Sequence, residues 1–289
     1  MEKINKVDRG ISPVSLEDII GKEDIVSIID NSFKNIEASI YYLLIGLPGS
    51  GKTFILNYIA SNMKQYSVSY INSCELYVQV SPLDLLRQFF RKAKPDSPSI
   101  LLLDEIDVLF STEKRLSPCF LQVLKDELSE LPNNVLFIAS TAVPWMIQPE
   151  ALNIFSKVLY CRLPNAEQRA LFINHFFKES LTVSELHYCT ENTENYSFSD
   201  LTVLAKDVLM NPIREILKNR FYKVQDGMYY KAKSSDEGVI EIDPTSIQWD
   251  KFFIRKVNIE DIKERIAILK PSMRESDFDQ IEGFYNRTK

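Results

Sequence analysis

The sequence has no long apolar run. No stretch of its 289 residues approaches the ~20 apolar residues that a membrane-spanning helix needs. Its charged beginning, Met1-Glu-Lys-Ile-Asn-Lys6, also lacks the apolar segment of a secretory signal. We therefore expect a cytoplasmic protein with no direct membrane insertion, although partners could bring it to a membrane surface.

Cysteine and histidine are scarce. The four cysteines are widely spaced and form no C-x-x-C pair, and only His175 and His187 could join them as metal ligands. This pattern argues against structural zinc. It favours reduced thiols in a cytosolic protein.

Positively charged residues are also fewer than negatively charged ones. Lys and Arg number 34 against 40 Asp and Glu, which gives a formal net charge of −6. Nucleic-acid binding needs a basic face that releases counterions, so no nucleic-acid partner is expected. A local basic strip contains Arg87, Arg91, Lys92 and Lys94, and we interpret it as the solvated face of a helix.

The octapeptide Gly46-Leu-Pro-Gly-Ser-Gly-Lys-Thr53 fits the P-loop pattern G-x-x-x-x-G-K-[ST]. In such a loop backbone N–H groups curl around phosphates, Lys52 reaches the outer phosphates and Thr53 ligates Mg²⁺. An apolar run precedes the loop and a helical pattern follows it, which is the context a P-loop requires. The expected nucleotide contacts are Pro48, Gly49, Ser50, Gly51, Lys52, Thr53 and Phe54.

Five strand-like runs alternate with helical patterns in the first part of the chain, which predicts a parallel five-stranded sheet with helices on both faces. The runs are Ile40–Ile45, Tyr66–Ile71, Ile100–Leu103, Val135–Ser140 and Val158–Cys161. A large α/β domain is expected over residues 1–164 and a small helical domain over 165–289. Turn signals between short β-prone pieces predict a β insertion at about residues 221–252.

The segment Ser99-Ile-Leu-Leu-Leu-Asp-Glu-Ile-Asp107 is an apolar strand that ends in acids. This is the Walker B arrangement, in which Asp104 would hold Mg²⁺ and Glu105 would orient and polarise the attacking water. An acidic pair at the end of a buried strand is costly without a cation nearby. Together with the P-loop, it predicts ATP hydrolysis with Lys52 and Glu105 as catalytic residues.

The P-loop, the Asp-Glu-Ile-Asp motif and the ending Leu269-Lys-Pro-Ser-Met-Arg-Glu-Ser-Asp-Phe278 resemble the meiotic clade of AAA ATPases. Within that clade the chain is most similar to the vacuolar sorting branch that disassembles ESCRT-III polymers, with katanin, spastin and fidgetin as cousins. Ser15-Leu-Glu-Asp-Ile-Ile-Gly21 resembles the entry segment of the family, so Asp18, Ile20 and Gly21 are expected to contact adenine.

The resemblance implies an AAA-type P-loop NTPase that uses ATP and Mg²⁺. Subunits of the family form hexameric rings whose pore loops pull on substrate polypeptide, so the implied partners are other subunits, identical or different, and ESCRT-III-like proteins. The implied location is cytoplasmic and peripheral at endosomal membranes. We expect the family's N-terminal recruitment domain to be absent.

Several positions depart from the family pattern. Ala142 occupies the position of the Asn that senses the γ-phosphate, and it cannot form that hydrogen bond. Asn153 and Ile154 stand where the family has paired arginine fingers. Phe198 replaces a glycine at a helix start near the nucleotide, where it would either crowd the base or turn aside and pack. In the altered first pore loop, Tyr77 could serve as an aromatic grip or be a packing residue.

Three functional hypotheses remain open from the sequence. In the first, the chain is a working ATPase that forms a ring and remodels ESCRT-III-like filaments. In the second, it is a nucleotide-gated regulatory subunit that hydrolyses ATP poorly, because it lacks the arginine fingers, which contribute on the order of 10³ to 10⁵ in rate. In the third, it is a scaffold that binds nucleotide only for stability.

Overall fold

The computed structural model describes residues 20–34, 38–63, 65–93, 97–111, 113, 115–177 and 181–288. The chain divides into two compact units. The first comprises the residues up to Gln168 together with the segment from Met273 onward, and the second runs from Arg169 to Ser272. Asp18 and Lys94, which the sequence singled out, lie outside the described residues.

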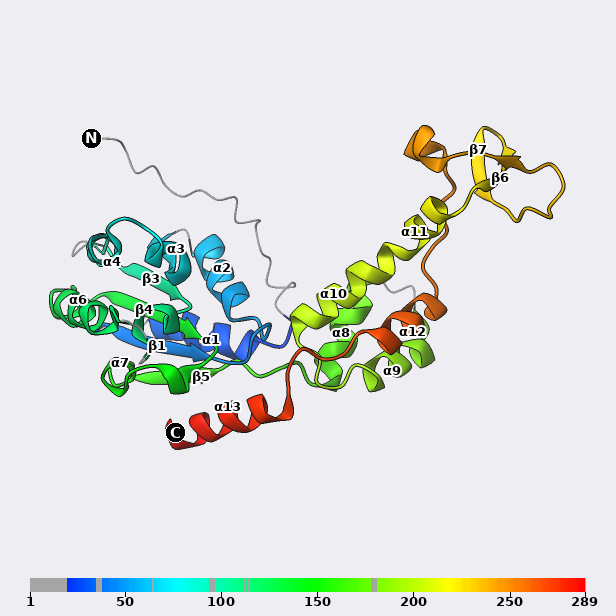
Figure 1. Cartoon of the computed structure of the whole chain (residues 1–289). Helices are drawn as coiled ribbons and strands as arrows, with labels where there is room; N and C mark the ends of the chain where they lie inside the picture. The colour runs from blue at the N-terminus through cyan, green and yellow to red at the C-terminus, as the bar shows by residue number, and fades with distance from the viewer. Residues whose placement is uncertain are drawn as a thin grey trace. The chain divides into compact units, whose positions relative to one another are not determined.

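The first unit is built on a parallel five-stranded sheet, as predicted (Figure 1). Its strand order is β2-β3-β4-β1-β5, and every neighbouring pair is parallel. Strands β3 and β4 are mostly apolar and buried along their whole length, as continuous hydrophobic runs require in a sheet covered on both faces. The strands are β1 (Ile40–Ile45), β2 (Ser67–Asn72), β3 (Ser99–Asp104), β4 (Val135–Thr141) and β5 (Lys157–Tyr160).

Alternate residues of the strands enter two separate cores. Leu44 and Leu102 pack with helices α1 (Glu23–Lys34) and α2 (Lys52–Asn62) on one face. Leu43 and Phe137 pack on the other face. Several helices cover this second face: α3 (Ser73–Tyr77), α4 (Pro82–Phe90), α5 (Asp107–Phe110), α6 (Ser117–Ser129) and α7 (Pro149–Leu152). The short helix η2 (Pro144–Met146) precedes α7 and packs on the same core. Because successive side chains of a strand point to opposite faces, one apolar run supplies both cores.

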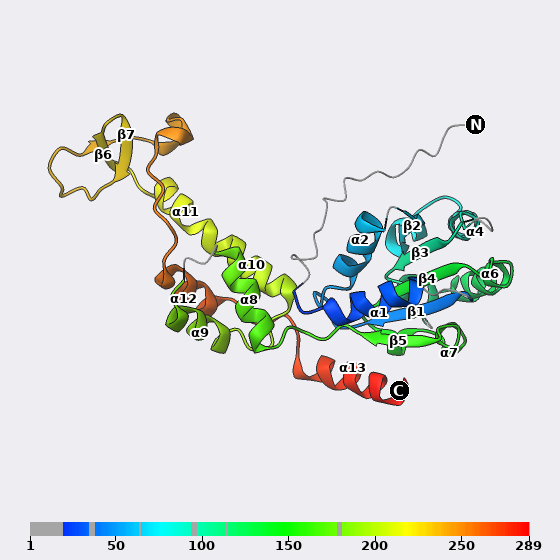
Figure 2. The ribbon, with the colours of Figure 1, turned by 180° about the vertical axis from the view of Figure 1, so that it is seen from behind.

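The last helix, α13 (Glu275–Thr288), belongs to the first unit (Figures 1 and 2). Ile281 is fully buried in the core of that unit, and the rings of Tyr160 and Tyr285 lie 5.1 Å apart. The sequence instead grouped everything after residue 164 in the second domain. Helical periodicity shows that a segment has an apolar face, but it does not identify the surface that covers this face.

The second unit is helical. It contains α9 (Val183–Glu191), α10 (Phe198–Leu209), α11 (Asn211–Lys218), α12 (Ile259–Ile268) and most of α8 (Ala166–Phe176). Leu201, Val208 and Ile262 are among its core residues. Capping boxes fix the starts of α9, α10 and α12, because each N-cap side chain accepts from the backbone N–H of the third helical residue, whose own side chain accepts from the N-cap backbone N–H.

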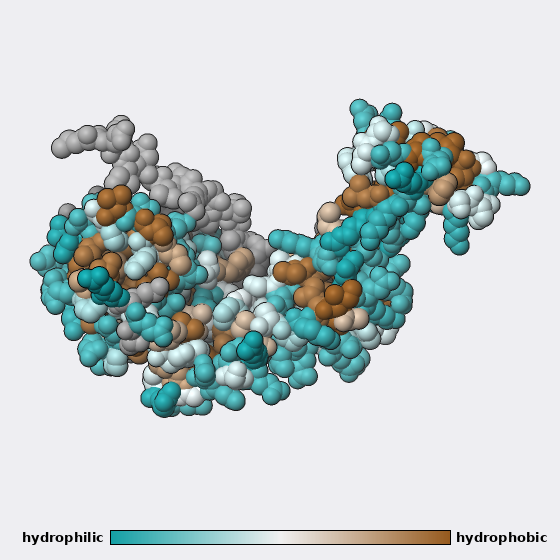
Figure 3. Space-filling view, in the orientation of Figure 1, coloured by the Kyte–Doolittle hydropathy of each residue, from teal (hydrophilic) through white to brown (hydrophobic). Residues whose placement is uncertain are grey.

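A small antiparallel sheet follows α11 at the predicted position of the β insertion (Figure 1). It consists of β6 (Phe221–Gln225), β7 (Met228–Lys231) and β8 (Ile240–Glu241), followed by η3 (Pro244–Ser246) and η4 (Trp249–Lys251). Asp226 and Gly227 both have positive φ, which suits a tight hairpin turn. Arg255 ties this region to the helices through ion pairs with Glu215 and Asp261. Figure 3 shows apolar surface on this small sheet.

Candidate nucleotide site

The P-loop joins the end of β1 to the start of α2. Gly49 and Gly51 have φ values of 73° and 100°, in the left-handed region that glycine adopts without strain. Gly46 is also required, since a Cβ there would lie 2.4 Å from the carbonyl oxygen of Cys161. The first turn of α2 has no side-chain cap, so its backbone N–H groups are available to an anion.

Lys52 lies inside this loop. Its Nζ donates to the carbonyl oxygens of Gly46, at 2.6 Å, and Leu47, at 3.1 Å. Burial lowers the pKa of the ammonium group, while nearby negative groups, including the Asp104 carboxylate, act to raise it. The structure therefore brings the P-loop lysine within electrostatic reach of the acids at the end of β3.

Asp104 is buried, with 1% of its surface exposed. One carboxylate oxygen accepts from the hydroxyl of Ser140, at the end of β4, and the other from the hydroxyl of Tyr70 at 3.1 Å. Burial and the Asp104 charge raise the pKa of Tyr70, so this phenol stays a hydrogen-bond donor. Asp104 and the exposed Thr53 supply the hard oxygen donors that Mg²⁺ prefers. The residues present thus fit a magnesium ion.

Glu105 follows Asp104 with a φ of 58°, which is uncommon for a residue other than glycine. Its N–H donates to the hydroxyl of Ser140 at 3.2 Å. Its Oε2 accepts from Asn72 Nδ2 at 3.2 Å and from Cys74 Sγ at 3.1 Å. The exposed carboxylate is thus oriented by two donors from the junction of β2 and α3.

Four residues of this site were missed at the sequence level: Tyr70, Asn72, Cys74 and Ser140. None belongs to the P-loop or to the Walker B segment. Strand register supplies a signal for Asn72, because it lies opposite Asp104 at the ends of neighbouring parallel strands. The other three could be inferred only after the order of the strands was known.

The entry segment is partly described. Gly21 has a φ of 72°, and its carbonyl oxygen accepts a 3.4 Å hydrogen bond from Gln168 Nε2. Ile20 is half-buried, and Phe54, after Thr53 in α2, is 39% exposed. Within the P-loop Pro48 is exposed, whereas the Ser50 hydroxyl is buried and has no hydrogen-bond partner among the described residues.

The structure shows what surrounds the positions that depart from the family pattern. Ala142 directly follows β4, and its neighbour Thr141 donates to Asp107 at 2.6 Å. Asn153 is exposed at the end of α7, whereas Ile154 packs against the core of the first unit. Phe198 contacts Phe172 in the helical unit, with ring centroids 5.5 Å apart. Of the two interpretations of Phe198, the structure favours packing.

The segment that the resemblance predicts as the first pore loop presents aliphatic side chains. Tyr77 is half-buried and its ring lies 6.2 Å from that of Phe120, as expected for a packing residue. Val78 and Val80 are instead 77% and 101% exposed.

The basic strip is partly neutralised. Arg87 pairs with Asp84 at 3.0 Å, and Arg91 forms two hydrogen bonds with Glu127, the shorter also 3.0 Å. Paired arginines of this kind are ordinary features of a solvated helix face.

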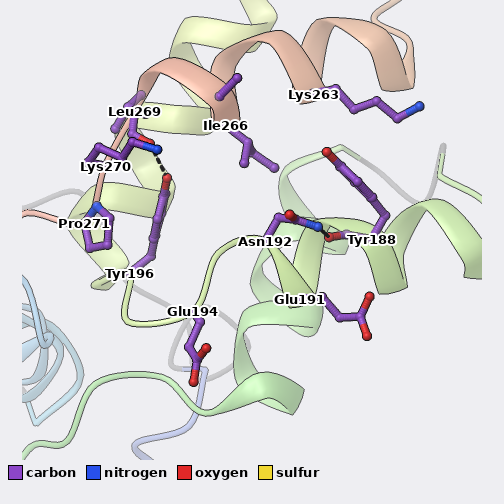
Figure 4. A pocket seen from close by; sticks show the side chains of 11 residues that line it. Tyr188, Glu191, Asn192, Glu194, Tyr196, Lys263, Ile266, Leu269, Lys270 and Pro271 are labelled. Carbon is purple, nitrogen blue, oxygen red and sulfur yellow. Dashed lines mark hydrogen bonds between the residues drawn. The ribbon is translucent and has the colours of Figure 1, made fainter.

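The helical unit has a separate pocket of about 370 Å³ between α9, α12 and the segments that follow them (Figure 4). Tyr188, Tyr196 and Lys263 contribute to its lining. The Tyr196 hydroxyl donates to the Leu269 carbonyl at 2.6 Å, and Lys263 pairs with Glu260 at 2.8 Å. Its lining contains none of the predicted nucleotide-binding residues.

A glycine-rich loop at the end of β1, acids at the end of β3 and the order β2-β3-β4-β1-β5 define a P-loop NTPase of the AAA type. The family model described as "ATPase family associated with various cellular activities (AAA)" matches residues 42–163. The chain is a divergent AAA protein related to the meiotic-clade ATPases, which confirms the family resemblance.

Relatives support this placement. Vacuolar protein sorting-associated protein 4B of Mus musculus is 24% identical over 84% of this chain and 60% of that protein. Spastin of Gallus gallus is 31% identical over 67% of this chain and 34% of that protein. An uncharacterised AAA domain-containing protein of Schizosaccharomyces pombe is 30% identical over 80% of this chain and 30% of that protein. The chain therefore spans about a third to three fifths of these relatives.

A solved structure of an AAA domain has the same fold. The crystal structure of the FIGL-1 AAA domain in complex with ADP has a TM-score of 0.70 and 25% sequence identity, covering 93% of this chain and 88% of that chain. No helix within the described ranges is both long and apolar enough to cross a bilayer.

Proposed function

We propose that this chain binds ATP with Mg²⁺ and hydrolyses the γ-phosphate bond. The single observation that carries the proposal is the buried Lys52 of an intact P-loop within electrostatic reach of Asp104 and Glu105. In this proposal the loop amides and Lys52 hold the phosphates, Thr53 and Asp104 hold Mg²⁺, and Glu105 polarises water.

The finer proposal is that subunits assemble into a hexameric ring that remodels ESCRT-III-like filaments at the cytoplasmic face of endosomes. Similarity to vacuolar protein sorting-associated protein 4B over most of this chain supports it. The β insertion beyond α11, which we interpret as a feature of the sorting branch, is a second support. The exposed Val78 and Val80 would meet the substrate polypeptide in the pore.

A second candidate function is a nucleotide-gated subunit with weak hydrolysis. The observation that favours it is the pair Asn153 and Ile154, a polar amide and a core-packed aliphatic side chain where the family has arginines. In a mixed ring, a neighbour with intact arginines could still activate this chain. This chain could not activate the site that it faces.

The deciding experiment is steady-state ATP turnover measured against protein concentration. Glu105→Gln serves as the blank, because it removes the base while preserving size. Glu130→Gln, the same change at the exposed C-cap residue that directly follows α6, is the matched control and should behave as wild type. Turnover that rises cooperatively and disappears only in Glu105→Gln supports a self-assembling ATPase.

Binding without turnover above the blank would refute hydrolysis by the isolated chain and favour the nucleotide-gated subunit. In that case turnover should be measured again after mixing with an AAA subunit that retains its arginines. Equal thermal stabilisation by ADP and ATP, with no change in assembly, would instead favour the scaffold hypothesis.

A further inference from the structure

Lys22 is a buried lysine that the proposed hydrolysis does not use. It follows Gly21 at the end of the entry segment and directly precedes α1, and 6% of its surface is exposed. Burial is the first cause that lowers the pKa of its ammonium group. A buried ammonium group is costly unless it is hydrogen-bonded. The Nζ atom of Lys22 donates to the carbonyl oxygen of Arg162 at 2.5 Å, and this bond offsets part of that cost.

The acceptor of this bond lies just beyond strand β5, beside the start of the P-loop. Arg162 follows Cys161, whose N–H donates at 2.8 Å to the carbonyl oxygen of Ile45, the last residue of β1. The carbonyl oxygen of Cys161 is also the atom that a Cβ at Gly46 would approach to 2.4 Å. The backbone of residues 161 and 162 is therefore held against the first residue of the P-loop, and Lys22 bonds to that same backbone.

Gly21, on the other side of this lysine, is fixed at both of its backbone polar groups. Its N–H donates to Glu23 Oε1 at 3.0 Å, and its carbonyl oxygen accepts from Gln168 Nε2 at 3.4 Å. Its φ of 72° lies in the left-handed region that glycine adopts without strain. The Lys22 carbonyl oxygen accepts from the Val26 N–H at 3.1 Å, at the start of α1. The end of the entry segment is therefore preformed, and it is held by residues from distant parts of the chain.

We propose that Lys22, together with Gln168, is a positioning residue that sets the spacing between the base-binding and phosphate-binding parts of the nucleotide site. A nucleotide spans both parts, because its base is expected at the entry segment and its phosphates at the P-loop. Holding the two parts at the correct spacing before binding lowers the cost of association. The inference rests on the nucleotide-binding function proposed above. It assigns this role to two side chains that belong to neither motif and are not expected to touch the phosphates.

The first test compares the binding of MgATP with that of inorganic tripolyphosphate and Mg²⁺, by isothermal calorimetry in the Glu105→Gln background, which prevents hydrolysis. Lys22→Met is close to lysine in length but removes the donor. It should weaken MgATP binding at least about tenfold, because a hydrogen bond from a charged group is lost. Binding of tripolyphosphate, which has no base, should stay within about twofold of the parent protein. Lys125→Met, the same change at an exposed lysine of α6, is the matched control and should alter neither affinity.

The second test changes the other contact of the segment. Gln168 Oε1 accepts from the Asn165 N–H at 3.1 Å, directly before α8, and Gln168→Glu retains that acceptor. A glutamate cannot donate to the Gly21 carbonyl oxygen, so MgATP binding should weaken at least about threefold while tripolyphosphate binding stays unchanged. With Glu105 intact, Lys22→Met should raise KM for ATP and leave kcat within about twofold, because the groups around the γ-phosphate are unaltered.

The two proposals fail differently. If the parent protein binds MgATP and both Lys22→Met and Gln168→Glu bind it equally well, the positioning role is overturned and the nucleotide-binding function stands. If Lys22→Met weakens MgATP and tripolyphosphate by the same factor, Lys22 acts on the phosphates or on the P-loop itself, and the positioning role is again overturned. If circular dichroism shows that Lys22→Met is unfolded, the two affinities of Gln168→Glu decide by the same criteria. If the parent protein binds neither ligand, the nucleotide-binding function fails, and the inference fails with it.

Discussion

Asn153→Arg should raise ATP turnover in the assembled protein. The perturbation restores one arginine at the position where the family has its fingers. Asn153 is exposed at the end of α7, with φ −66° and ψ −9°, a conformation that arginine adopts readily. The structural cost should therefore stay within ~0.5 kcal/mol, as for most surface substitutions.

The magnitude of the gain is bounded. An optimal finger contributes on the order of 10³ to 10⁵ in rate, which is ~4 to 7 kcal/mol of transition-state stabilisation. A single restored finger without its partner should give less, and we expect at least about a tenfold rise in kcat. Ile154→Arg should add little, because Ile154 packs against the core and a charge there would cost about 1–3 kcal/mol of stability.

The assay is turnover above the concentration at which light scattering detects oligomers, with Asn153→Gln as the control for side-chain size without charge. No gain from Asn153→Arg in demonstrated oligomers would refute the reasoning. It would mean that the activating cation comes from another position or that residues 153 and 154 do not face a neighbouring site.

Three further predictions follow from the P-loop and the ion pairs. Lys52→Ala should abolish nucleotide binding in isothermal calorimetry, and unchanged affinity would contradict the proposed role of the loop. Gly46→Ala should weaken binding at least about tenfold, because a Cβ would meet the Cys161 carbonyl oxygen at 2.4 Å. Its control is Gly283→Ala, where a Cβ meets nothing within 4 Å. Arg255 holds the pKa of the buried Asp261 down to about 2, below the ordinary 3.8, so Asp261 stabilises the fold above pH ~4 and loses that contribution as pH falls through about 2. Asp261→Asn should therefore cost about 2 kcal/mol in urea unfolding at pH 7 and much less near pH 2, and a pH-independent difference would contradict this.

The sheet was predictable because its three inner strands, β1, β3 and β4, carry continuous apolar runs. Ile40–Ile45 was located without error, and the bounds of the other strands shifted by only one residue at each end that moved. The P-loop and Walker B residues were predictable for another reason, since their chemistry fixes residue type and spacing over a short stretch. Both kinds of signal are local in the sequence.

What could not be predicted depends on contacts between distant residues. Cys74 and Ser140 reach the Walker B acids only because β2 and β4 flank β3. The packing of Tyr77 on Phe120 depends on where α6 lies. For Asn153 and Ile154 the sequence indicated the loss of arginines, but only the structure separates an exposed position from a core position.

The placement of α13 has a consequence for how this protein is made. The helical unit is inserted into the AAA unit, because the chain leaves the first unit after Gln168 and returns to it at Met273. Ile281 and Phe284, which are buried in the core of the AAA unit, are synthesised only after the whole helical unit. During translation, part of the apolar surface of the nucleotide-binding unit therefore stays uncovered until α13 has been synthesised. That helix begins more than a hundred residues after the last strand of the sheet ends.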